Sequence, residues 1–237
     1  MVRAIEILIF MSLLCQDLYP SGEDSINIYM FHGQGADNRV FENLSLEGNY
    51  RITYINYPVP GARTTLKNFA LSMINQIDTM VPCILIGQSM GGMICTELAD
   101  TLKPVKVIII SSAKCRQELP GRYRFQRYIP VNRLVPKRLI KVGAVFFQPL
   151  VEPDCLKNPV FRSMILKKDP RYMKRTVKMI INWERKEYSP GIIHIHGEND
   201  STIPVKNVKY DYLIRDGSHV MVYTRGTEIS SLIQTLL

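Results

Sequence analysis

Hydrophobic residues along the chain follow two alternating patterns. Short runs rich in Ile and Tyr, or in Ile and other apolar residues, predict strands, and segments with a hydrophobic residue every three or four positions predict helices. The expected strands are residues 26–33, 51–57, 83–87, 105–111, 191–197 and 208–214. The expected helices are residues 64–80, 93–102 and 225–237, with Thr64 or Thr65 capping the first and Thr227 capping the last.

Residues 83–87 and 105–111 are almost wholly apolar. Strands of this kind are buried on both faces, which is typical of a mainly parallel sheet between two layers of helices. The strand–helix alternation supports the same arrangement. We therefore predict an α/β protein with a doubly wound, mainly parallel sheet, and a length of 237 residues suits one large domain with an insertion.

The insertion is expected at residues 114–188, where charge and proline change the pattern. From Lys114 to Glu187 there are 19 Lys and Arg and 6 Asp and Glu, a balance of +13 in a chain whose net charge is +9. A loop of this length is uncommon, so the segment is predicted to be a basic helical cap. The core would then comprise residues 26–113 and 189–237, after an N-terminal segment of residues 1–25.

The N-terminal segment and the cysteines bear on location. Residues 3–16 are apolar but interrupted by Glu6, and the stretch is too short to span a bilayer. The five cysteines include no CxxC pair, which disfavours a disulfide framework or a zinc site and favours a reducing compartment. We expect a cytoplasmic protein without stable membrane insertion, or an exported one if the apolar stretch is a signal. The same stretch could instead form an edge strand.

One candidate for chemistry is Gly87-Gln88-Ser89-Met90-Gly91-Gly92, directly after the strand at 83–87. In a Gly-x-Ser-x-Gly pattern the glycines Gly87 and Gly91 leave room for a strained turn that exposes the serine, here Ser89. The helix that follows favours negative charge developing beside the serine. The alternative is an ordinary strand-to-helix turn with a solvent-facing serine.

Three further features follow other predicted strands. His32-Gly33-Gln34-Gly35 is a turn whose Gln34 N–H, together with the N–H of Met90, could form an oxyanion hole. Asp200 follows the strand at 191–197 and could orient a histidine. Its neighbours Glu198 and Asn199 could be mistaken for the residue with this role. His219 lies in a loop before the last helix. Ligands of an open parallel sheet bind beyond the carboxyl ends of its strands, where all of these residues are expected.

With nucleophile, acid and base in the order Ser89, Asp200 and His219, residues 26–237 resemble the α/β-hydrolase fold superfamily. The resemblance implies a serine hydrolase with a helical cap inserted after the strand at 105–111. It also implies catalysis by Ser89, His219 and Asp200 without a cofactor or a metal. One departure is the start of the chain, where the usual leading β-hairpin has little room.

The expected activity is cleavage of a carboxylic ester or thioester of a small molecule through an acyl-enzyme. Alternatives are a C–C bond hydrolase or lyase that uses the same triad, and a non-catalytic binding protein of the same fold. The basic segment either lies on solvated helix faces or attracts an anionic substrate. Nucleic-acid binding through residues 122–141 is disfavoured, because prolines break that stretch. His194 and His196 share a strand face without a third metal ligand, so packing is expected for them, and His32 is assigned to its turn.

Overall fold

The structure is a computed structural model that describes residues 25–128, 136, 139, 142–143, 146 and 159–237. In this part of the chain six parallel strands form one sheet in the order β2-β1-β3-β4-β5-β6. The strands are β1 (Ile26–Phe31), β2 (Tyr50–Tyr54), β3 (Cys83–Gln88), β4 (Lys106–Ile110), β5 (Ile192–Gly197) and β6 (Tyr212–Ile214). The predicted fold class is confirmed.

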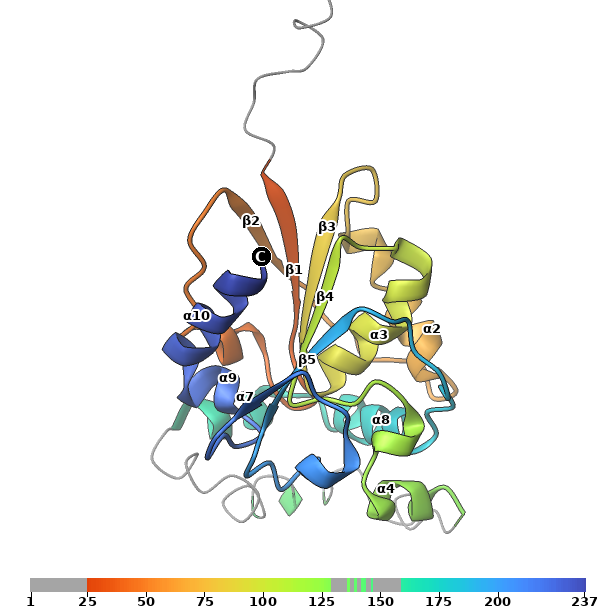
Figure 1. Cartoon of the computed structure of the whole chain (residues 1–237). Coiled ribbons are helices and arrows are strands. Elements are labelled where there is room, and N and C mark those ends of the chain that lie inside the picture. Colours follow the sequence, from red (N-terminus) through yellow and green to blue (C-terminus); the bar gives the residue numbers. More distant parts are fainter. Residues whose placement is uncertain (1–24, 129–135, 137–138, 140–141, 144–145, 147–158) are drawn as a thin grey trace, which may run out of the picture.

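Helices cover both faces of the sheet (Figure 1). Alternate side chains of the central strands point to opposite faces, so that Leu85 and Ile109 belong to one hydrophobic cluster and Ile86 and Ile108 to the other. The first face is covered by α2 (Leu66–Leu71), α3 (Met90–Leu102) and α8 (Pro170–Ile181). The second is covered by α7 (Pro159–Lys167), α9 (Met221–Thr224) and α10 (Gly226–Leu236). The apolar strands are thus buried on both sides, as their sequences predicted.

The helix predicted over residues 64–80 is wrong in its extent. Thr65 caps α2 by accepting a hydrogen bond from the Asn68 N–H at 3.1 Å, but the α-helix ends at Leu71 and is followed by the 3-10 turn η2 (Ile74–Gln76). The Gln76 side chain makes two hydrogen bonds of 2.9 Å with the backbone of Asn56. This pairing with a distant loop fixes the chain in a conformation that periodicity alone does not reveal.

Other element boundaries also differ from the predictions, among them those of the last helix and the last strand. The last helix begins at Gly226 after Arg225, and no side chain caps it, so the prediction of Thr227 as its cap is wrong. The last strand begins at Tyr212 rather than at residue 208, because Asp211 turns the preceding segment toward β5. The Asp211 N–H donates to the His194 carbonyl at 2.9 Å, and the Asp211 carboxylate accepts from the His194 N–H at 2.8 Å.

The described helices of the predicted cap lie near the carboxyl ends of the strands (Figure 1). They are α4 (Gly121–Gln126), α7 and α8, and the 3-10 turn η3 (Arg116–Glu118) precedes them. Three cations of this segment donate to backbone carbonyls of core loops: Arg122 to Ser201 and Thr202, Arg175 to Pro60, and Lys178 to Ala62. These cations hold the segment against the core.

Several expectations fall on residues that the structure does not describe. The N-terminal segment, with its alternatives of signal or edge strand, lies outside the described residues, and so does most of the stretch at 129–158. Among the described helices, none has the length and apolar character needed to cross a membrane. The boundaries assigned to the core and the cap therefore stay predictions.

Candidate active site

Ser89 occupies a strained turn between β3 and α3. Its backbone angles are φ 53° and ψ −121°, a combination rarely adopted by a residue with a side chain. Gly87 and Gly91 permit this turn: a Cβ added at Gly87 would lie 2.5 Å from the backbone carbonyl carbon of Gly91. A Cβ added at Gly91 would overlap the Phe31 carbonyl oxygen. The local geometry is that of a nucleophile elbow rather than of an ordinary turn.

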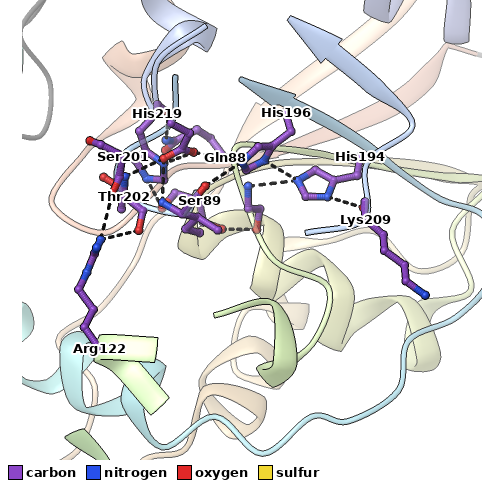
Figure 2. A network of polar contacts seen from close by, with 12 residues as sticks. Gln88, Ser89, Arg122, His194, His196, Ser201, Thr202, Lys209 and His219 are labelled. Atoms are coloured by element: carbon purple, nitrogen blue, oxygen red, sulfur yellow. Dashed lines mark hydrogen bonds and ion pairs between the residues drawn. The ribbon is translucent and has the colours of Figure 1, made fainter. Parts of the chain in front are cut away.

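The structure brings Ser89, His219 and Asp200 into one hydrogen-bonded chain. Figure 2 shows the Ser89 and His219 side chains of this chain of contacts. His219 Nε2 lies 2.9 Å from Ser89 Oγ, and His219 Nδ1 lies 2.8 Å from Asp200 Oδ2. Since a carboxylate only accepts, His219 donates its Nδ1–H to Asp200 and leaves Nε2 free to accept the Ser89 hydroxyl proton. The arrangement suits general-base activation of a serine.

Asp200, rather than its acidic neighbour, faces the histidine. The Asp200 side chain is fully buried, and its Oδ1 accepts hydrogen bonds of 2.8 Å from the N–H groups of Thr202 and Ile203. The Glu198 carboxylate instead accepts from the Asp216 N–H, and the Asn199 amide donates to the Asp216 carboxylate. Two backbone donors therefore hold the Asp200 carboxylate in one orientation under His219.

The turn after β1 lies against the elbow. A Cβ added at Gly33 would come within 3.0 Å of Ser89 Cβ, so the residue that precedes Gln34 lies beside the serine. The amide N–H groups of Gln34 and Met90 make no hydrogen bond to another described residue. Backbone N–H donors close to a serine hydroxyl suit stabilisation of an oxyanion.

No protein-family model and no curated protein matches the sequence. Solved structures of low sequence identity do resemble it. An enol-lactonase from Burkholderia xenovorans LB400 is 14% identical with a TM-score of 0.70, covering 91% of this chain and 92% of that one. A thermophilic esterase from Thermogutta terrifontis is 13% identical with a TM-score of 0.60, covering 90% and 89%. YbtT, a type II thioesterase of the yersiniabactin biosynthetic pathway, is 13% identical with a TM-score of 0.60, covering 91% and 94%.

The chain has the α/β-hydrolase fold. In the α/β-hydrolase fold a serine after a central strand, an acid after a later strand and a histidine after the last strand meet at one sheet edge. Here β3, β5 and β6 precede Ser89, Asp200 and His219. At these identities the similarity to solved structures establishes the fold, and the chemistry rests on the site itself.

Two further residues hold the site together and were not among the candidates predicted from the sequence. Gln88, buried beside the serine, donates from Nε2 to the His219 carbonyl at 3.2 Å. Ser112 donates from Oγ to the Ser89 carbonyl at 2.7 Å. Gln88 lies inside the Gly-x-Ser-x-Gly pattern, so its position was a signal, but only the fold brings residue 219 within its reach.

The histidines outside the candidate triad are all buried in this α/β-hydrolase fold. His32 packs against Tyr57 with ring centroids 4.0 Å apart and donates from Nδ1 to the Gly33 carbonyl at 2.9 Å. Burial lowers the pKa of His32 to about 4, so the ring is neutral at neutral pH. His194 and His196 contact one another, and within the described ranges no three His, Cys, Asp or Glu side chains are grouped to hold a metal ion.

Proposed function

We propose that this chain is a serine hydrolase that cleaves a carboxylic ester or thioester of a small molecule. The observation that carries the proposal is the hydrogen-bonded chain from Ser89 Oγ through His219 to the buried Asp200 carboxylate. The N–H groups of Gln34 and Met90, which make no hydrogen bond within the described part of the chain, support it. Esterase, lactonase and thioesterase activities among the structurally similar proteins support an acyl substrate.

The proposed reaction proceeds through an acyl-enzyme. Ser89 Oγ attacks the substrate carbonyl carbon while His219 Nε2 accepts the hydroxyl proton, and Asp200 stabilises the imidazolium that forms. The N–H groups of Gln34 and Met90 donate to the tetrahedral oxyanion. The C–O or C–S bond then breaks as His219 returns the proton to the leaving alcohol or thiol. Water then attacks the acyl carbon with His219 again as base. The bond between that carbon and Ser89 Oγ breaks as His219 returns the proton to Oγ, and the carboxylic acid leaves.

The buried acid explains why a weakly acidic hydroxyl could react. An imidazolium that forms at His219 lies 2.8 Å from a carboxylate that is shielded from water, where charges interact more strongly than in solvent. The serine itself needs no movement, since its strained backbone already holds Oγ 2.9 Å from the base. This preorganisation lowers the reorganisation needed to reach the transition state.

The substrate's charge is a separate part of the proposal. Arg122, Arg175 and Lys178 donate to carbonyls of core loops, which favours a structural role for these three cations. We expect neutral and anionic acyl esters to be hydrolysed at comparable rates at low and at high salt. A preference for anionic esters that disappears at high salt would instead indicate that the basic segment attracts substrate.

Fluorophosphonate labelling tests the reaction class. The wild-type chain should be labelled on Ser89, and Ser89→Ala and His219→Ala should abolish labelling. Ser231→Ala is a matched control, because Ser231 is exposed on α10 and donates only to the Thr227 carbonyl. Labelling that survives Ser89→Ala, or an intact protein that does not label, would refute the serine-hydrolase proposal and favour a binding protein.

A further inference from the structure

Two buried histidines form a second hydrogen-bonded chain behind the candidate triad (Figure 2). His194 Nδ1 lies 3.1 Å from the Lys209 carbonyl oxygen, and His194 Nε2 lies 3.0 Å from His196 Nδ1. His196 Nε2 lies 2.9 Å from the Ile203 carbonyl oxygen. Both rings are fully buried, and the paired atoms are in direct contact at 2.9–3.1 Å.

The atoms at the two ends of this hydrogen-bonded series fix the number of ring protons that the series needs. Both terminal atoms are carbonyl oxygens, which only accept hydrogen bonds. Each of the three contacts therefore requires one proton on a ring nitrogen. Two neutral imidazoles carry only two protons, so a neutral pair leaves two lone pairs facing each other at 3.0 Å. A buried unmade hydrogen bond costs roughly 1–3 kcal/mol.

A third proton completes every contact, and the surroundings place the resulting charge on His196. The Ser112 N–H donates to His194 Nε2 at 3.4 Å, so that this nitrogen is an acceptor and His194 carries its one proton on Nδ1. Burial holds the pKa of His194 well below its ordinary value, in agreement with a neutral ring. His196 then donates from both nitrogens, to His194 and to the Ile203 carbonyl.

The candidate triad supplies the counter-charge. His196 Nε2 lies 3.6 Å from Asp200 Oδ2, the oxygen that also accepts from His219. Burial and His219 lower the pKa of His196, and the Asp200 carboxylate and the Ile203 carbonyl oppose only part of that shift, so that the net direction is downward. The third proton is therefore inferred from the hydrogen-bond geometry and not from the pKa. The titratable and charged groups that face the pair are Asp200, His219, Lys114 and Asp211.

We propose that His194 and His196 together hold three ring protons at neutral pH, so that His196 is an imidazolium and a positioning residue for Asp200. The inference rests on the proposed function, because it assigns Asp200 to the base His219. The Asp200 carboxylate would then interact with both the His196 and the His219 rings, and not with His219 alone.

This arrangement has a consequence for the base. A positive charge on His196 repels a second proton on His219, which shares the same carboxylate oxygen. The cationic pair therefore keeps His219 unprotonated, and able to accept the serine proton, at a lower pH than Asp200 alone would allow. The Ile203 contact adds rigidity, because His196 and Asp200 both bind residue 203, one through its carbonyl and the other through its N–H.

Nitrogen-15 NMR of the histidine rings tests the proton count without any substrate. The chain has four histidines, and loss of signals in His194→Gln and His196→Gln assigns the pair. At pH 7 we expect two protonated ring nitrogens on His196 and one on His194, and one protonated nitrogen on each ring would overturn the proposal. A wild-type chain that does not react with fluorophosphonate would refute the proposed function and leave this count unaffected.

His196→Gln tests the role as a positioning residue. Glutamine keeps a neutral donor that can reach the Ile203 carbonyl but removes the positive charge. We expect the titration midpoint of the His219 ring, followed by NMR, to rise by about one pH unit, and the acid limb of fluorophosphonate labelling to shift with it. Slower labelling at every pH with an unchanged midpoint would show a purely structural role and overturn the proposal.

Discussion

Gly91→Ala tests the close approach of the elbow to the turn that follows β1. A Cβ at this position would overlap the Phe31 carbonyl oxygen and lie 2.5 Å from the carbonyl carbon of Phe31 and 2.8 Å from the His32 oxygen. All three are backbone atoms of the strand end that leads into the turn bearing Gln34, and no side-chain rotation can relieve the overlap. Carbon contacts are optimal near ~3.5 Å, so α3 and β1 must separate by more than about 1 Å.

The expected loss in the free energy of unfolding follows from that separation. Overpacking of a buried backbone contact typically costs about 1–3 kcal/mol, and rigid atoms on both sides place Gly91→Ala near about 3 kcal/mol. The same displacement moves Ser89 relative to the Gln34 N–H. A misplacement of about 1 Å lowers catalysis roughly 100-fold, and we expect a comparable fall in the fluorophosphonate labelling rate.

Urea unfolding and the labelling rate measure the two effects separately. Gly121→Ala is the matched control, since a Cβ at Gly121 meets nothing within 4 Å, and it should leave the free energy of unfolding within about 0.5 kcal/mol of wild type. If Gly91→Ala matched Gly121→Ala in both measurements, the tight contact between the elbow and the turn would not exist as described. A loss of stability without a loss of labelling would show that the turn does not contribute to the reaction.

Three further perturbations have defined outcomes. His32 binds a proton near pH 6.5 in the unfolded chain but only near pH 4 in the folded chain. Its contribution to the free energy of unfolding, about 3 kcal/mol, is therefore present above pH 6.5 and lost as the pH falls to 4. His32→Asn should flatten this part of the pH profile of urea unfolding, and an unchanged slope would contradict the argument. Asp200→Asn should lower the labelling rate by about 10³–10⁴-fold, because an amide facing His219 Nδ1 no longer favours the required tautomer; retained labelling would show that Asp200 does not act. Arg122→Met should slow labelling about fivefold, because it frees the carbonyls of residues 201 and 202 beside Asp200. Arg162→Met replaces an exposed cation of α7 and should leave the labelling rate unchanged. Equal labelling rates for the two variants would show that Arg122 does not support the site.

Much of the fold could be read from local patterns. The apolar strands at 83–88 and 106–110 were predicted within a residue or two, because continuous burial of both faces leaves a clear signature in the sequence. The helix predicted at 64–80 was too long because Gln76 binds the backbone of Asn56, a contact between segments whose proximity the sequence does not reveal. Thr227 is suited to capping, yet the chain enters α10 one residue earlier.

For the candidate site, the sequence by itself determined the local chemistry. The glycines around Ser89 indicate the strained turn because only residues without a side chain fit there, and the order of Ser89, Asp200 and His219 indicates the fold. The tertiary structure decided which groups meet: the Gln88 side chain and the His219 carbonyl, and the histidine pair beside the Asp200 carboxylate. Proton counts and charge depend on every acceptor within about 3 Å, and those acceptors come from strands and loops that are distant in the sequence.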